Sequence, residues 1–130
     1  MENGSVETEK EFLGRLDRVF EMSLQERDAF VKSISNNPRL CFLVLSSLPS
    51  GLFSKEQKET LFERATSDVC QAAFLTIFYN FTDEELSKIV NRILESGHPH
   101  LLDLIYVLGK LSMAQKELLR RLIITYRERR

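Results

Sequence analysis

The residues with the richest ligand chemistry are His98, His100 and Asp103, which surround Pro99 in one short segment. In a helix that begins near Pro99, His100 and Asp103 are one turn apart. Imidazole and carboxylate groups bind zinc, but a tight site needs three or four convergent ligands, and neither cysteine is near in sequence. We therefore interpret this cluster as a solvated helix entrance, and we predict no metal and no cofactor.

Cys41 and Cys70 are the candidate nucleophiles, and both stand among large apolar residues. We interpret them as two buried free thiols, because burial in apolar surroundings raises the pKa of a thiol and makes it inert. The chain has no glycine-rich phosphate loop, no Walker-type lysine and no His-Glu-x-x-His pattern. No catalytic residue is predicted, and the chain is not expected to be an enzyme.

Basic residues gather in the last fifteen positions, against two glutamates there. A helix from Met113 would place an apolar stripe on one side and basic residues on the other, with Met113 and Ile124 away from the stripe. One interpretation is a solvated helix end with favourable charges. The other is a surface for an acidic partner or for phosphates. The hypothesis that residues 113–130 bind a protein or another copy of the chain names Lys116, Arg120, Ile124, Arg127, Arg129 and Arg130.

Helix starts recur along the chain at spacings of 31, 28 and 30 residues. At each start a hydroxyl residue is followed three positions later by Glu or Gln. This is a capping box, in which the hydroxyl and the third side chain each bind an end amide. The pairs are Ser23/Glu26, Ser54/Gln57, Thr82/Glu85 and Ser112/Gln115.

Apolar residues follow each cap at fixed distances, which predicts an amphipathic helix in every unit. Positions seven and eleven after a cap lie on one helix face. They hold Phe30, Leu61, Ile89 and Leu119, then Ile34, Ala65, Ile93 and Ile123. The eighth position is apolar in three units and is Arg120 in the last.

The second half of each unit is more apolar, over residues 40–48, 69–79 and 101–108. Asn37-Pro38, Ser67-Asp68 and His98-Pro99 suit helix starts, and Gly97 suits a helix end. We interpret these segments as helices covered on most sides, with Phe78 and Leu104 in the core. Their β propensity leaves strands, and thus an α/β sheet, as the alternative.

Thr8 and Glu11 form one more capping box, which opens a leading helix through Phe20. The prediction is an all-α fold of about eight short helices, arranged as tandem helix–turn–helix repeats with a period of about 30 residues. This architecture resembles HEAT- and armadillo-like α-solenoids, but no sequence motif of those families is present. A compact helical bundle is the alternative arrangement of the same helices. Residues 1–8 are expected to be a flexible tail and residues 9–130 a single domain.

A net charge of −1 excludes an electrostatic nucleic-acid binder at the level of the whole chain. No signal peptide or long apolar run is evident, so we expect an intracellular protein, in cytoplasm or nucleus, without membrane contact. The function that fits best is a non-catalytic scaffold or adaptor that binds a peptide or helix of a protein partner, or associates with itself through the C-terminal helix. The alternatives are RNA binding through the basic C-terminal helix and a small α/β enzyme.

Overall fold

A computed structural model describes residues 8–129 of the chain, and residues 1–7 and 130 lie outside it. The predicted tail over residues 1–8 therefore lies outside the described residues, except for Thr8, which caps the first helix. Among the helices of the described part, none is long and apolar enough to cross a membrane.

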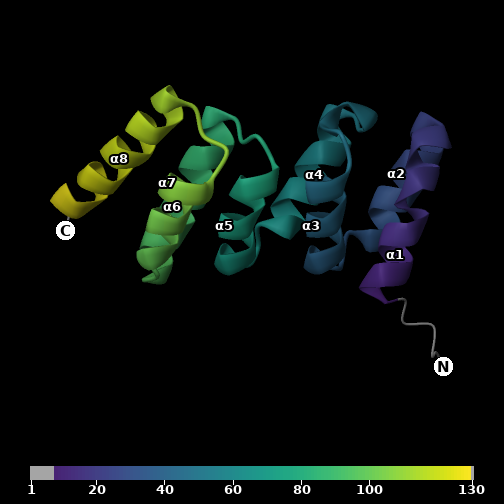
Figure 1. Cartoon of the computed structure of the whole chain (residues 1–130), viewed down its shortest axis with the longest axis horizontal. Coiled ribbons are helices and arrows are strands. Elements are labelled where there is room, and N and C mark those ends of the chain that lie inside the picture. The colour runs from purple at the N-terminus through teal and green to yellow at the C-terminus, as the bar shows by residue number, and fades with distance from the viewer. Residues whose placement is uncertain (1–7, 130) are drawn as a thin grey trace. The chain divides into compact units, whose positions relative to one another are not determined.

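The described residues form eight α-helices and two short 3-10 helices, without any strand. The all-α prediction is confirmed, and the α/β alternative is wrong because the apolar segments carry helix caps and helical spacing. The elements are α1 (Glu9–Arg15), η1 (Leu16–Glu21), α2 (Leu24–Ile34), α3 (Pro38–Ser47), η2 (Ser50–Leu52), α4 (Lys55–Ala65), α5 (Val69–Phe78), α6 (Asp83–Ser96), α7 (His100–Leu108) and α8 (Met113–Glu128) (Figure 1).

The chain divides into two compact units, Met1–Ala65 and Thr66–Arg130. In the first unit, α1 lies beside α3 and α2 lies beside α4, while α3 and α4 form a tightly packed hairpin. In the second unit, α5 lies along α7 and α6 lies along α8. The prediction of one continuous repeat domain over residues 9–130 goes further than this division and stays a prediction.

The core of the first unit is built from the faces that the spacing predicted. Phe12 of α1 stacks on Phe30 of α2 with 6.1 Å between ring centroids, and the Arg15 guanidinium lies 5.1 Å from the Phe12 ring. Arg27 of α2 connects this region to η1 and η2, because its guanidinium donates to the carbonyls of Val19, Phe20 and Leu52. The buried apolar residues are Phe12, Leu16, Val19, Phe30, Val31, Ile34, Cys41, Phe42, Leu43, Val44, Leu45, Phe53, Leu61, Phe62 and Ala65.

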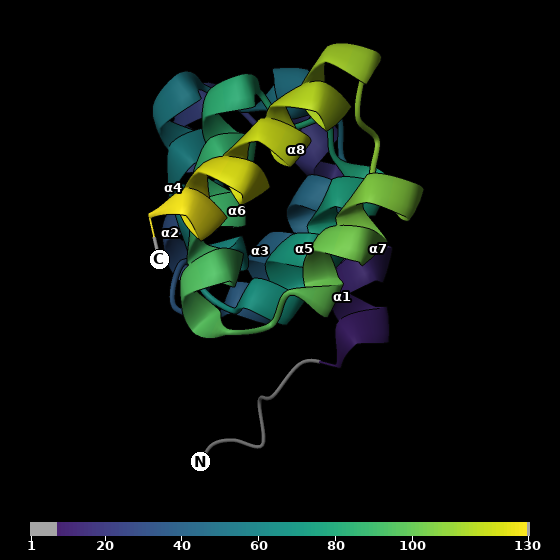
Figure 2. The same ribbon diagram turned by 90° about the vertical axis from the view of Figure 1, so that its left-hand side faces the viewer.

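The core of the second unit lies between the pairs α5/α7 and α6/α8, and Figure 2 shows α8 in front of α6. Its buried apolar residues are Ala72, Ala73, Leu75, Phe81, Leu86, Ile89, Val90, Ile93, Leu101, Leu102, Ile105 and Leu119. The turn after α7 sits against α5, where the Lys110 amide donates to the Thr76 carbonyl at 2.7 Å. Gly109 is required in this turn, because a Cβ there would lie 3.1 Å from the Thr76 hydroxyl oxygen and 2.5 Å from the Ile105 carbonyl oxygen.

All five predicted capping boxes are present. Thr8, Ser23, Thr82 and Ser112 each accept a hydrogen bond from the amide three residues later, and the side chain at that later position accepts from the cap amide. At α4 the same two bonds join Ser54 and Gln57, at 2.9 and 3.1 Å. Gly97 ends α6 in the left-handed conformation, with φ of 78°, as its position predicted.

Two of the capping boxes also join neighbouring helices, because their third residue is Gln. The Gln57 amide nitrogen donates to the Leu24 carbonyl at the start of α2, at 3.4 Å. The Gln115 amide nitrogen donates to the Phe81 carbonyl just before α6, at 2.6 Å. A glutamate could cap in the same way but, when ionised, has no hydrogen to donate. Each unit thus has a Gln box on α4 or α8 and a Glu box on the amphipathic helix before it, α2 or α6, and the first unit has a second Glu box on α1.

The leading helix differs from its prediction, because the α-helix ends at Arg15 and continues as the 3-10 segment η1. Gly14 weakens the α-helix where the change occurs, since glycine loses more backbone freedom in a helix than any other residue. Phe12, Leu16 and Val19 are still buried, so the tighter turn keeps the apolar face toward the core.

The prediction that the apolar helices are covered on most sides is wrong for α5 and α7. Small residues, Ala72 and Ala73, form much of the inner face of α5, while Phe74 and Phe78 are about half exposed. On α7, Leu102 and Ile105 are buried, whereas Leu104 is half-buried and Val107 and Leu108 are exposed. High apolar content does not show which face of a helix is covered by another helix. The arrangement of the packed helices determines which face is buried.

Candidate functional site

The last helix is fixed to the rest of its unit along its inner face. At the start, Gln115 binds the Phe81 carbonyl and lies 3.3 Å from a carboxylate oxygen of Asp83. One turn later, Leu119 is fully buried, and Leu122 and Ile123 beyond it are half-buried. These contacts hold α8 along α6 and determine which of its faces points outward.

The outward face of α8 combines large apolar side chains with cations. Met113 is 81% exposed and Ile124 is 55% exposed, which are high values for residues that usually lie inside proteins. Arg120 and Arg127 are exposed beside them. At about 100° per residue, positions 113, 116, 120, 124 and 127 fall within an arc of about 80°. We call this face the C-terminal surface; it comprises Met113, Lys116, Arg120, Ile124 and Arg127.

Lys116 links the C-terminal surface to α7. Its ammonium nitrogen lies 5.2 Å from the centroid of the Tyr106 ring, within the range of a cation–π contact. Tyr106 is 38% exposed, and the next two residues of α7, Val107 and Leu108, are 71% and 53% exposed. The exposed apolar area of this unit therefore includes residues of both α7 and α8.

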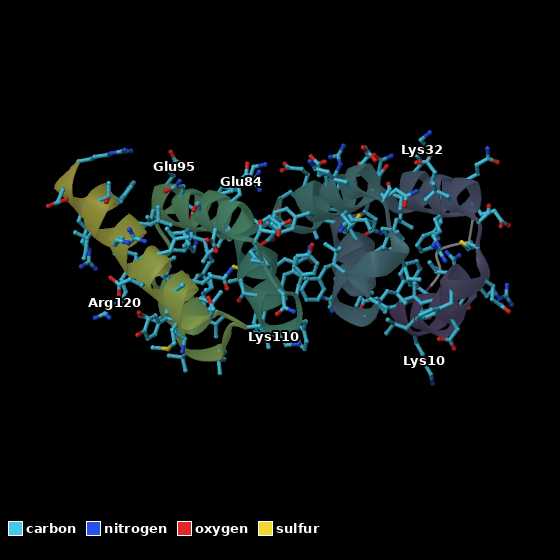
Figure 3. All side chains as sticks on the ribbon, turned by 90° about the horizontal axis from the view of Figure 1, so that it is seen from above. Lys10, Lys32, Glu84, Glu95, Lys110 and Arg120 are labelled. Atoms are coloured by element: carbon cyan, nitrogen blue, oxygen red, sulfur yellow. The ribbon has the colours of Figure 1, made fainter. Side chains whose placement is uncertain are left out.

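The charge of the C-terminal surface is only weakly compensated on its own helix. Arg120 lies 3.8 Å from the Glu117 carboxylate, and both side chains are more than half exposed. An exposed pair one turn apart contributes little to stability, so Arg120 can exchange Glu117 for a partner's carboxylate at little cost. Glu84 and Glu95 belong to α6 and point away from the side on which Arg120 lies (Figure 3).

The predicted partner-binding residues are brought together in part. Lys116, Arg120, Ile124 and Arg127 share the outward face of α8. Arg129 is exposed but lies two residues beyond Arg127, about 200° further around the helix, so it is not part of the same face. Arg130 lies outside the described residues.

The histidine cluster is a solvent-exposed helix start. The rings of His98 and His100 are 5.9 Å apart, and His98 Nδ1 lies 3.0 Å from the Ser96 carbonyl. Asp103 is exposed in the first turn of α7. Among residues 8–129, no three His, Cys, Asp or Glu side chains are grouped so that they could hold a metal ion.

The two cysteines differ, and the prediction that both are buried is wrong. Cys41 is fully buried and its sulfur lies 3.4 Å from the Ile34 carbonyl, to which the thiol donates. Burial raises the pKa of Cys41 to about 11, although the charge of Arg64 opposes the shift. Cys70 is exposed, because it lies in the first turn of α5, ahead of the inward-facing Ala72 and Ala73.

Sequence reasoning missed the outward apolar residues of α7. Val107 and Leu108 belong to a segment that is almost wholly apolar, and apolar content alone predicts that both lie in the core. The register gave no signal either: Ile77 and Phe78 of α5 align with them, counting back from the following cap, but the sequence places Phe78 in the core as well, and only the structure shows that it is exposed.

Comparison of the chain with protein-family models, curated proteins and solved structures gave no match.

Proposed function

We propose that this protein is a non-catalytic protein–protein interaction module, of the scaffold or adaptor kind, that binds its partner through the C-terminal surface. The observation that carries the proposal is the exposure of Met113 and Ile124 on a face that also holds three cations. Interface centres are typically apolar with a polar rim, and arginine is enriched in them.

The two kinds of side chain would have different effects on binding. Burial of Met113 and Ile124 removes apolar area from water and supplies affinity at about 25 cal/mol per Å² before the costs of association. Lys116, Arg120 and Arg127 raise the rate of encounter with an acidic partner, and salt weakens that effect. We therefore expect a partner with an apolar centre and carboxylates around it.

The regular caps support a finer proposal, that the helices are tandem repeats of about 30 residues. Within each unit, every helix lies along the helix two places away in the chain. This is the neighbour relation of α-helical solenoids, which bind peptides and helices along their surfaces. A repeat protein of this kind needs no reactive side chain for its function.

The test is affinity capture from native extract with wild type and three variants. Ile124→Glu places a carboxylate in the C-terminal surface, whereas Thr125→Glu adds the same charge one residue later, about 100° around the helix. Arg120→Ser with Arg127→Ser removes two of the cations. We expect Ile124→Glu to lose the captured protein, Thr125→Glu to retain it, and the double variant to capture it more slowly.

Two results would contradict the proposal. If Ile124→Glu and Thr125→Glu capture the same proteins equally well, the C-terminal surface is not the binding site. If the captured material is RNA, and its capture depends on the arginines but not on Ile124, the nucleic-acid alternative is correct. Circular dichroism of each variant confirms that the helical fold is retained.

A further inference from the structure

The large apolar side chains that reach solvent are concentrated near the two ends of the described chain. Ten such residues are exposed among those the structure describes, and eight of them belong to the first two helical segments and α2, or to α7 and α8. They are Leu13, Phe20 and Leu24 near the beginning, and Tyr106, Val107, Leu108, Met113 and Ile124 near the end.

The helix-packing pattern explains why apolar residues are left exposed there. α1 and α2 each pack along a helix two places later in the chain, and α7 and α8 each pack along a helix two places earlier. In the described chain, α1 and α2 have no helix two places earlier, and α7 and α8 have none two places later. Each end therefore has helix faces of the type that a further helix pair would cover.

The two ends carry opposite charge. Residues 1–28 contain eight carboxylates and four cations, a net charge of −4. Residues 107–130 contain seven cations and two carboxylates, a net charge of +5. The remaining chain is close to neutral, so the two ends attract each other between molecules and each end repels its own kind.

The beginning of the chain also combines exposed apolar residues with charged ones. Leu13, Phe20 and Leu24 are 41%, 51% and 61% exposed, and the exposed carboxylates of Asp17 and Glu21 lie among them in sequence. Arg15 and Arg18 are exposed in the same stretch, so the acidic excess of this end belongs to the wider segment, residues 1–28. We call the three apolar residues and the two carboxylates the N-terminal surface. Its side chains would meet Met113 and Ile124 with apolar groups, and Arg120 and Arg127 with carboxylates.

We propose that the C-terminal surface binds the N-terminal surface of a second copy of this chain, head to tail. This inference rests on the proposed function and names its partner. A symmetric contact between two C-terminal surfaces would bring Lys116, Arg120 and Arg127 of both copies together, which like charge opposes. A head-to-tail contact leaves one free surface of each kind, so association continues past the dimer unless a ring closes.

The test is sedimentation velocity of the full chain over a range of concentrations. Two variants are compared with wild type, and each replaces an exposed apolar residue by a charged residue that the opposite surface would repel. Leu24→Lys places a cation in the N-terminal surface, and Ile124→Glu places a carboxylate in the C-terminal surface. We expect wild type to grow past the dimer as its concentration rises, and to dissociate at high salt. Each variant alone should associate at least about tenfold more weakly, the ratio that a single central interface residue commonly controls.

An equal mixture of the two variants makes the test specific. Leu24→Lys keeps its C-terminal surface and Ile124→Glu keeps its N-terminal surface, so the mixture should form dimers and stop there. Self-association of Leu24→Lys at the wild-type level would overturn the inference in favour of a symmetric contact. A wild type that stays monomeric would overturn it as well, while partner capture that depends on Ile124 would still uphold the proposed function. Thr125→Glu is the matched control and should associate as wild type does.

Discussion

Gln57 and Gln115 each make hydrogen bonds of two kinds with one amide group. The carbonyl oxygen of the side chain caps its own helix, and the amide nitrogen donates to a backbone carbonyl of a neighbouring helix. Glu26 and Glu85 stand at the same position of the preceding amphipathic helices, where their carboxylates accept from the cap amide and have no hydrogen to donate. The choice between Gln and Glu therefore decides whether a cap also joins two helices.

We expect Gln57→Glu to destabilise the protein by about 1–3 kcal/mol, the cost of leaving a buried polar group without its partner. Gln57 is only 4% exposed, and the new carboxylate would also lie near the Leu24 carbonyl oxygen. Glu26→Gln makes the reverse change at an exposed cap and should alter stability much less. Urea unfolding measures both, and equal effects would show that the Gln57 bridge contributes nothing.

The capping glutamates make stability depend on pH in the acid range. Hydrogen bonds from the amide and hydroxyl of Ser23 lower the pKa of Glu26 below 4.5, and Thr8 does the same for Glu11. Because the folded pKa is lowered, this contribution is fully present above the unfolded pKa. It is lost as the pH falls from about 4.5 through the folded value.

Wild type should therefore lose stability relative to Glu26→Gln as the pH is lowered from 7 to 3. The variant keeps a capping acceptor but has no proton to gain at this position. The measurement is the difference between the two thermal midpoints at each pH. A difference that stays constant over this range would mean that the carboxylate of Glu26 is not bonded to its cap.

The two thiols should react at very different rates with an aromatic disulfide reagent. Cys70 is exposed and should be labelled in the native state, while Cys41 is buried, and its pKa of about 11 leaves little thiolate near neutral pH. We expect one thiol per chain to react quickly and the second only after denaturant is added. Cys70→Ser, which removes the fast phase, identifies the residue. Fast labelling of both thiols would contradict the placement of Cys41.

Among the helices and turns, the turn between α7 and α8 depends on a close approach that only glycine permits. A side chain at Gly109 would meet the Ile105 carbonyl and Thr76, so we expect Gly109→Ala to destabilise by about 1–3 kcal/mol through overpacking. A Cβ at Gly14, inside α1, would meet no atom within 4 Å beyond its own stretch of helix. There Ala should stabilise the protein by about 0.5–1 kcal/mol, because it restricts the unfolded chain and favours the helix. Thermal unfolding of the two variants gives opposite shifts if both placements are correct.

The start of each amphipathic helix was predictable because a cap is local: its two hydrogen bonds join residues three positions apart, as Ser54 and Gln57 do. Buried faces at seven and eleven residues after a cap were predictable for the same reason, as Phe30 and Ile34 confirm. The buried faces of the apolar helices were not predictable, since Phe78 and Val107 are exposed although their segments are almost wholly apolar. Which side of such a helix is covered depends on contacts between distant segments.

For the molecule as a whole, the candidate site could be predicted in part. The basic outward side of α8 follows from helical spacing, which predicts that Arg120, Ile124 and Arg127 lie together. The contribution of α7 depends on the turn at Gly109 and on the contact between Lys116 and Tyr106, neither of which spacing reveals. Opposite charge at the two ends is visible in the sequence. It suggests a binding surface only together with the exposed apolar residues near it, which the structure shows and the sequence does not.

Site-specific photo-crosslinking of the full chain in native extract tests directly whether the C-terminal surface is the binding site. A photoreactive amino acid is placed at Met113 or Ile124 in that surface, or at Glu84 or Glu95 on α6 as controls. We predict protein adducts from positions 113 and 124, with none from 84 and 95, whose side chains point away from Arg120 (Figure 3). Adducts from the α6 positions alone, or crosslinks to nucleic acid in place of protein, would contradict the proposed function.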